Sequence, residues 1–118
     1  MLSGRKDQNL NRHMKIFITG VAGFLGSHLA DLMISQGHTV AGNDNMIGGY
    51  TDNVPQDVEF HQIDCCDLEN LTKAMEGCDI VYHTAATAYE GLSVFSPVLV
   101  TRNIFEASVT TITAAIRN

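Results

Sequence analysis

Residues 15–26 read KIFITGVAGFLG, and they are the most informative part of the sequence for the architecture of the chain. Its first five residues are mostly apolar and β-branched, which indicates a buried strand. Three glycines spaced three apart follow the strand: Gly20, Gly23 and Gly26. A buried strand that runs into a glycine-rich turn and then an amphipathic helix is typical of the first βαβ unit of a dinucleotide-binding domain.

Each glycine of this turn has a separate role in the predicted unit. Gly20 lets the chain leave the strand in a tight turn where a Cβ atom would clash. Gly23 lets the backbone approach a pyrophosphate, and Gly26 lets the new helix pack against the strands. The pyrophosphate would lie at the helix N-terminus, where free N–H groups and the helix dipole favour an anion. The alternative is a purely structural turn; the flanking strand and helix favour dinucleotide binding.

The composition fits a single domain with a hydrophobic core. The chain has 118 residues, of which 45% are hydrophobic and 17% are charged. Its net charge of −6 argues against a nucleic-acid partner, because such a partner requires a basic face. No apolar run approaches the ~18 residues of a membrane span. The polar residues 1–13 lack the apolar core of a secretory signal, so we expect a flexible tail there.

The three cysteines predict reduced thiols. Their number is odd, Cys65 and Cys66 are adjacent, and no partner stands at zinc-ligand spacing from them or from Cys78. We therefore expect a cytoplasmic protein without a metal site. A redox role for the Cys65–Cys66 pair is the alternative interpretation.

Strand and helix patterns alternate along the rest of the chain. Short apolar runs predict strands at residues 15–19, 39–43, 58–63 and 79–83. Apolar residues at spacings of three and four predict helices at residues 24–36, 68–76 and 98–117. Glycine, proline and small polar residues predict loops at 46–56 and 84–97. The order predicts an α/β fold: a Rossmann-type parallel sheet with flanking helices, strand order 3-2-1-4, incomplete at four strands.

Two of the predicted helices carry a clear apolar face. We expect the first helix to pack on the sheet through Leu25, Leu29, Leu32 and Met33. We expect the last helix to pack through an apolar stripe of Phe105, Val109, Ile112 and Ile116.

Polar and small residues follow the strands at the end where ligands of parallel sheets bind. Asp44 stands 18 residues after Gly26 and is placed to accept hydrogen bonds from a ribose; Asp64 is placed to accept one from an adenine amino group. Thr84-Ala85-Ala86 is small enough to let the backbone approach a cofactor. The alternatives are ordinary turn, cap and loop residues. His83 ends a buried strand, where a structural histidine is commoner than a catalytic one.

The sequence resembles the extended short-chain dehydrogenase/reductase family, and within it the nucleotide-sugar epimerases and dehydratases. The matching stretches are TGVAGFLGSHLADLMISQGHTVAGNDN at 19–45, IDCCDL at 63–68 and VYHTAA at 81–86, with a weaker match in EGLSVFSPVLVTRN at 90–103. The resemblance implies NAD as the cofactor and a nucleotide sugar as the substrate.

The family pattern also implies a role for each matching residue. Pyrophosphate contacts are implied for Gly20, Gly23, Phe24, Leu25 and Gly26. Ribose contacts are implied for Asp44 and Asn45, adenine contacts for Asp64 and Cys65, and contacts on the nicotinamide side for Thr84, Ala85 and Ala86, with Asn103 near the cofactor.

The sequence departs from the family at the catalytic pair, a Tyr followed four residues later by a Lys. None of Tyr50, Tyr82 and Tyr89 has a lysine at that spacing. We therefore expect residues 14–118 to be an NAD-binding domain, truncated before the catalytic pair and the substrate-binding part of a longer enzyme. The alternative is a non-catalytic dinucleotide-binding module that senses or scaffolds. The sequence also leaves open whether the chain forms a homodimer.

Overall fold

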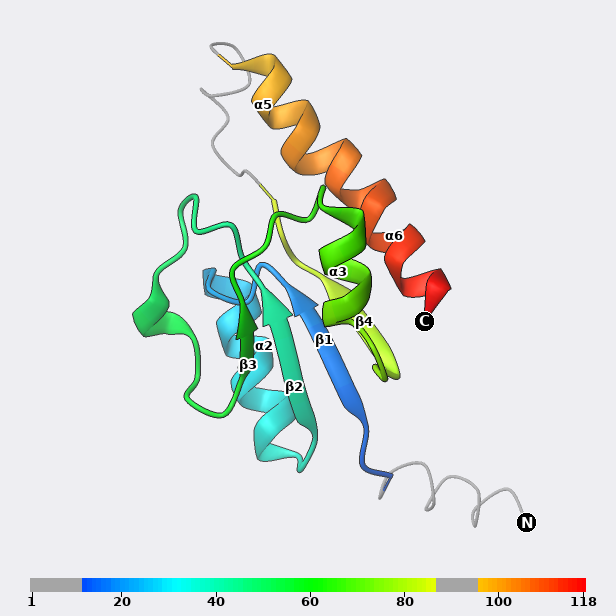
Figure 1. Cartoon of the computed structure of the whole chain (residues 1–118). Coiled ribbons are helices and arrows are strands. Elements are labelled where there is room, and N and C mark those ends of the chain that lie inside the picture. The colour runs from blue at the N-terminus through cyan, green and yellow to red at the C-terminus, as the bar shows by residue number, and fades with distance from the viewer. Residues whose placement is uncertain (1–11, 87–95) are drawn as a thin grey trace, which may run out of the picture.

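The computed structural model describes residues 12–86 and 96–118, which form an α/β structure around one sheet (Figure 1). Every strand pair in the sheet is parallel, and the strand order is β3-β2-β1-β4. The Rossmann-type sheet with order 3-2-1-4 is thereby confirmed. The strands are β1 (Lys15–Thr19), β2 (Thr39–Asn43), β3 (Glu59–His61) and β4 (Ile80–His83).

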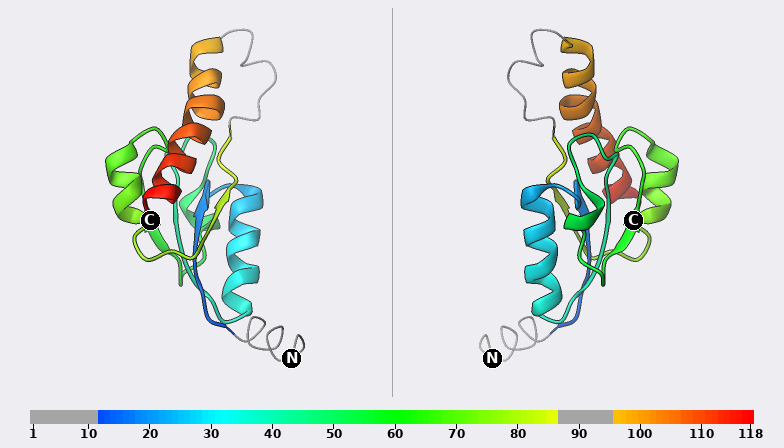
Figure 2. Two further views of the ribbon diagram at one scale, coloured as in Figure 1. Left: turned by 90° about the vertical axis from the view of Figure 1, so that its right-hand side faces the viewer. Right: turned by 90° about the vertical axis from the view of Figure 1, so that its left-hand side faces the viewer.

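Helices cover both faces of the sheet (Figure 2). Helix α2 (Phe24–Ser35) lies on one face, and α3 (Leu68–Ala74) and α6 (Ala107–Arg117) lie on the other. The loop after β2 contains a 3₁₀ turn, η1 (Thr51–Asn53). Helix α6 continues a short helix, α5 (Pro97–Thr101), through a π-helical turn, η2 (Arg102–Glu106).

The element boundaries differ from the predicted ones by one or two residues at several ends. Helix α2 ends one residue earlier than predicted because Gln36 caps it and Gly37 follows with φ +89°. Strand β3 is shorter than 58–63 because it pairs with β2 over three residues. The long helix begins at Pro97, where proline suits the first turn, and its π turn was not predicted.

Strand β1 is buried on both faces, as the continuous apolar run predicts. Ile16 and Ile18 face α2 and pack with Val40 of β2. Phe17, between them in sequence, points to the opposite face and packs with Leu71 of α3. All five side chains are fully buried, so two hydrophobic clusters meet back to back at this strand.

The packing face of α2 was only half predicted. Leu29 and Met33 do pack on the core, but Leu25 and Leu32 are 64% and 50% exposed. Small side chains let the helix lie closer to the sheet than four leucine-sized residues would allow. The buried positions of this helix are Gly26, Ser27 and Ala30.

The predicted packing face of the last helix was wrong. The four residues of the apolar stripe, called here the α6 stripe, are exposed: Phe105 by 69%, Val109 by 50%, Ile112 by 59% and Ile116 by 79%. The opposite face packs instead, again because small side chains permit a close approach to the sheet and to α3. Its buried residues are Ala107, Thr111 and Ala114.

Some predictions fall partly outside the described residues. Residues 1–11 of the predicted tail lie outside the described residues, and so do residues 87–95 of the predicted loop 84–97, which include Tyr89. Cys65, Cys66 and Cys78 are all free thiols, as predicted. No helix in the described part of the chain combines the length and hydrophobicity that a membrane span needs.

Candidate dinucleotide-binding site

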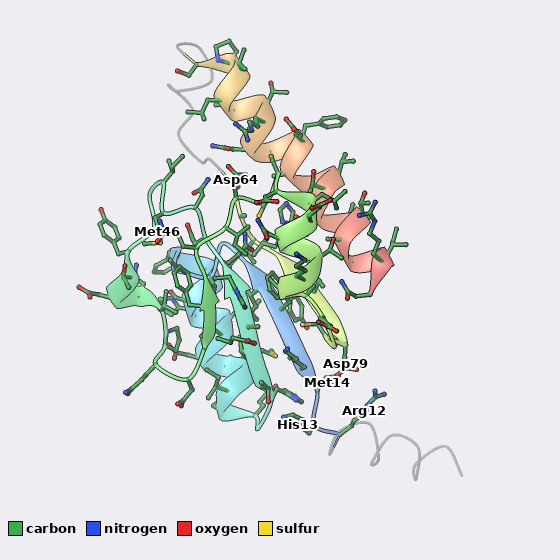
Figure 3. The ribbon with its side chains drawn as sticks, viewed as in Figure 1. Arg12, His13, Met14, Met46, Asp64 and Asp79 are labelled. Carbon is green, nitrogen blue, oxygen red and sulfur yellow. The ribbon has the colours of Figure 1, made fainter. Side chains whose placement is uncertain are left out.

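A cleft opens at the carboxyl ends of the strands, beneath the long helix. It is open to solvent, has a cavity volume of about 110 Å³, and is lined by the glycine turn, the ends of the strands and the start of α6. Figure 3 shows Asp64 at this end of the sheet and Met14 at the opposite end. Ligands of open parallel sheets bind at this position, where the strand order reverses.

Ten of the thirteen predicted site residues line this cleft. Phe24 and Leu25 do not, because their side chains project into solvent, and Gly26 does not, because it is buried beneath the turn. The ten that line it are Gly20, Gly23, Asp44, Asn45, Asp64, Cys65, Thr84, Ala85, Ala86 and Asn103.

Two glycines of the turn are required by close backbone approaches. Gly20 has φ +71°, and a Cβ there would lie 2.7 Å from the Cα of Ala85. A Cβ on Gly26 would lie 2.2 Å from the carbonyl oxygen of Gly20 and 2.9 Å from the Thr84 hydroxyl. All three distances are far below van der Waals contact, so no other residue fits at either position without a backbone shift.

Gly23 has a different environment. A Cβ there would meet one atom within 4 Å, the Gly20 carbonyl oxygen at 3.3 Å, so packing within the protein does not demand glycine. Gly23 is the N-cap of α2 and lines the cleft. Helix geometry leaves the N–H groups of Phe24, Leu25 and Gly26 without an intrahelical acceptor. Bare backbone and these N–H groups together provide a place for an anion.

The carboxylate of Asp44 is fixed at the rim of the cleft by two backbone N–H groups. Its Oδ2 accepts from Ala22 at 3.1 Å, and its Oδ1 accepts from Met46 at 2.8 Å. Met46 has φ +69°, a left-handed conformation that is uncommon for a residue other than glycine. A Cβ on Gly49 would approach Asp44 Oδ1 to 3.1 Å. The carboxylate is thus held in one orientation.

Asn43 is a site residue that sequence reasoning missed. Its side-chain amide is buried and donates to the carbonyl of Ile63 at 2.8 Å and to Cys65 Sγ at 3.3 Å. The backbone carbonyl of Asn43 accepts a hydrogen bond from the Gly20 N–H at 2.8 Å. Asn43 therefore connects the glycine turn with the end of β3, and its signal was an amide at the last position of a buried strand. The other unpredicted lining residues are Ile47, Gly48, Gly49 and Ala107.

The segment after β3 is connected to the long helix. Asp64 Oδ1 accepts from the N–H of Cys66 at 2.8 Å, and the Cys66 thiol donates to the carbonyl of Arg102 at 3.4 Å. Burial raises the pKa of the Cys65 thiol, and it also raises the pKa of the Cys66 thiol. Both groups are protonated at neutral pH, which disfavours the redox alternative.

The end of β4 is held to β1 by a dense set of hydrogen bonds. The Thr84 hydroxyl donates to the carbonyl of Thr19, and the N–H of Ala85 donates to the hydroxyl of Thr19 at 3.2 Å. His83 Nδ1 lies 2.6 Å from the same Thr19 hydroxyl, and its Nε2 lies 3.1 Å from the hydroxyl of Ser108. Both ring nitrogens are engaged, which fits the structural interpretation of His83.

The π turn places two residues of the long helix at the cleft. The N–H of Ala107 bonds to the carbonyl of Arg102, five residues earlier, and to that of Ile104, three residues earlier. Such turns are often found at functional sites. Asn103, inside the turn, is buried, and both Asn103 and Ala107 line the cleft.

Several solved structures and relatives that resemble this chain are nucleotide-sugar epimerases. The UDP-glucose 4-epimerase of Thermus thermophilus, solved with NAD, is 34% identical with a TM-score of 0.79, over 86% of this chain and 33% of that one. The UDP-glucose 4-epimerase of Thermotoga maritima, solved with UDP-glucose, is 29% identical with a TM-score of 0.83, over 88% and 34%. GDP-mannose 3,5-epimerase of Arabidopsis thaliana is 35% identical over 79 residues, 64% of this chain and 20% of that protein.

The chain spans about a fifth to a third of the length of these relatives. The family model described as the NAD dependent epimerase/dehydratase family matches residues 16–118, nearly all of the chain. With the parallel sheet, the glycine turn and the cleft at the strand ends, this match establishes that the chain belongs to the NAD-dependent epimerase/dehydratase family.

Proposed function

We propose that this chain is the NAD-binding portion of a nucleotide-sugar epimerase or dehydratase. The observation that carries the proposal is Asp44, a buried carboxylate fixed at the rim of the cleft by two backbone N–H groups. A carboxylate at the end of the second strand accepts hydrogen bonds from the two hydroxyls of an adenosine ribose. Residues 43–49 contain no Lys or Arg that would neutralise a 2′-phosphate, which favours NAD over NADP.

The glycine turn supports a pyrophosphate beside this ribose site. At Gly23 a Cβ would project where the cleft is open, since a single protein atom lies within 4 Å of it. The first-turn N–H groups of Phe24, Leu25 and Gly26 would donate to the phosphate oxygens. This arrangement explains how Phe24 and Leu25 serve the site although their side chains are exposed.

The remaining lining residues fit the two ends of the dinucleotide. We propose that Asp64 and Cys65 meet the adenine, and that Thr84, Ala85 and Ala86 line the nicotinamide side, with Asn103 beside the cofactor. When bound, NAD would supply the acceptor and later the donor of a hydride at a sugar carbon. The residues of this chain bind and orient the dinucleotide for that transfer.

The proton acceptor for sugar oxidation is the part of the reaction that the described residues do not supply. Removing the hydroxyl proton as the hydride leaves needs a base, and an unassisted Tyr has a pKa near ~10. Lys15 is engaged at the far end of β1, where its Nζ donates to the carbonyl of Glu76 at 3.1 Å, and Lys73 lies in α3. His83 is engaged at both ring nitrogens.

Isothermal titration of NAD and NADP into the wild type and Asp44→Ala tests the proposal. A hydrogen bond to a charged group contributes about 1.5–3 kcal/mol, so Asp44→Ala should weaken NAD binding by about 10- to 150-fold. Asp44→Asn keeps the side-chain volume and one acceptor oxygen, so it should fall between the two. Asp57→Ala, at an exposed turn, is the matched control. NADP binding as tight as NAD binding would contradict the proposal.

An activity assay separates binding from turnover. We expect the purified chain with NAD and a panel of UDP-, GDP- and dTDP-sugars to form no NADH and exchange no epimers above buffer. Sustained turnover that is abolished by His83→Ala would instead place the catalytic base within these 118 residues.

A further inference from the structure

Three elements meet at His83, the last residue of β4. Its Nδ1 lies 2.6 Å from the hydroxyl of Thr19 at the end of β1, and its Nε2 lies 3.1 Å from the hydroxyl of Ser108 on α6. The Thr19 hydroxyl also accepts from the N–H of Ala85 at 3.2 Å, and Ala85 lines the cleft. A continuous chain of hydrogen bonds therefore runs from α6 to the wall of the dinucleotide site.

The donors and acceptors fix the direction of this chain. The Ser108 hydroxyl donates to the carbonyl of Ile104, so its oxygen is left to accept the proton on His83 Nε2. In the neutral ring Nδ1 then carries no proton and accepts from the Thr19 hydroxyl. The oxygen of Thr19 keeps a lone pair for the N–H of Ala85, which can only donate.

Protonation of His83 breaks this arrangement. A proton on Nδ1 would force Thr19 Oγ1 to accept two bonds, and its own hydroxyl proton would lose its acceptor. Thr19 is fully buried, so water does not replace that acceptor. An unpaired buried donor is costly, and the simplest relief is a displacement of β4 and the residues after it.

Ala85 matters to the cleft because it packs directly on the glycine turn. A Cβ on Gly20 would lie 2.7 Å from the Cα and 2.8 Å from the nitrogen of Ala85. We propose that neutral His83 is a positioning residue that holds Ala85 against the glycine turn through Thr19, so that protonation of His83 weakens dinucleotide binding. This inference rests on the proposed function, because the ligand is the dinucleotide proposed above.

The surroundings of His83 set the pH range of the effect. Partial burial of the ring lowers the pKa of His83 below the usual value near 6.5, and no charged side chain in the described part of the chain contributes to the shift. In the described part of the chain, the hydrogen-bond partners of the ring are the Thr19 hydroxyl of β1 and the Ser108 hydroxyl of α6. Binding should therefore be constant at and above neutral pH and weaken as the pH falls through the pKa of His83.

Nitrogen-15 NMR of the imidazole in the ligand-free chain tests the direction of the hydrogen bonds. At about pH 7.5 we expect His83 to carry its proton on Nε2, with Nδ1 bare. The backbone amide of Ala85 should shift with pH at the same midpoint as His83. A proton on Nδ1, or an Ala85 amide indifferent to the titration of His83, would overturn the inference.

Calorimetry with NAD between about pH 5 and pH 8 tests the coupling to binding. The wild type should lose at least about fivefold in affinity toward the acid end, the equivalent of one buried hydroxyl left unpaired. In His83→Asn, the amide oxygen replaces Nδ1 as an acceptor and does not titrate, so the profile should flatten. His13→Asn, at the opposite end of the sheet, should keep the wild-type slope.

Two calorimetric outcomes contradict the inference: a flat wild-type profile, or a His83→Asn profile with the wild-type slope. Thr19→Val, which removes the hydroxyl at nearly constant volume, should weaken binding and flatten the profile if it folds. Failure of NAD to bind at any pH would overturn the proposed function instead. In that case the NMR titration of Ala85 still decides whether His83 positions this wall of the cleft.

Discussion

Helix α2 and helix α6 both pack on the sheet through small residues. They differ in which of their large apolar side chains remain exposed to solvent. In α2 the large apolar residues are divided, and Leu29 and Met33 pack while Leu25 and Leu32 do not. Across η2 and α6, all four residues of the α6 stripe face solvent while Ala107, Thr111 and Ala114 pack. The comparison shows that residue size, rather than apolar periodicity, decides which helix face meets this sheet.

The largest effect is expected where α2 passes closest to its neighbours. Gly26→Ala would place a Cβ 2.2 Å from the carbonyl oxygen of Gly20. We expect a loss of about 3 kcal/mol or more in the free energy of unfolding, measured by urea denaturation. Asp31→Ala, on the exposed side of the same helix, should change it by less than about 0.5 kcal/mol. Equal urea midpoints for Gly26→Ala and Asp31→Ala would contradict this prediction.

Gly23→Val tests the glycine that faces the cleft rather than the protein. The backbone at Gly23 has φ −82°, which valine adopts, so most of the fold should survive with a cost of about 1 kcal/mol for a poorer N-cap. NAD binding should fall by at least about 100-fold, because the side chain occupies the proposed pyrophosphate position. Circular dichroism checks the fold and calorimetry the binding. Near wild-type affinity in the folded variant would show that the pyrophosphate lies elsewhere.

A smaller effect is expected on the packed face of α6. Ala114 is fully buried between α6, α3 and the sheet, so Ala114→Leu should cost about 1–3 kcal/mol through overpacking. Val109→Leu introduces the same side chain on the exposed face and is the matched control. Thermal denaturation should separate the two, and a destabilised Val109→Leu would mean that the α6 stripe packs in solution.

The smallest effect on stability is expected in the α6 stripe itself. Ile112→Gln should change the free energy of unfolding by less than about 0.5 kcal/mol, because the side chain is mostly exposed. An exposed apolar stripe favours association, so sedimentation should show self-association of the wild type that weakens in Ile112→Gln/Ile116→Gln. A wild-type chain that stays monomeric would contradict this expectation and with it the homodimer.

The sequence was sufficient for the sheet and for most of the cleft, because both follow from local rules. A glycine turn after a buried strand, and polar residues at strand ends, place ten of the thirteen site residues at one end of a parallel sheet once the strand order is known. The clash of a Cβ at Gly20 or Gly26 is likewise a local consequence of the turn.

The rest depends on contacts between distant parts of the chain. Asn43 acquires its role from Ile63 and Cys65, some twenty residues later, and nothing beside Asn43 in sequence indicates those partners. The face of α6 that packs depends on the space left by α3 and β1. A periodic pattern reports that a helix is amphipathic, and it does not report whether the larger side chains fit that space.

The π turn has a consequence for how this segment tolerates insertions and deletions. Removing one residue from Arg102–Glu106 would replace the π-helical turn with regular α-helical hydrogen bonding. It would also rotate everything before the deletion by about 100° relative to α6. Asn103 would then leave the cleft while Ala107 and Ala114 kept their places, so the length of this turn, and not only its residues, determines whether Asn103 lines the cleft.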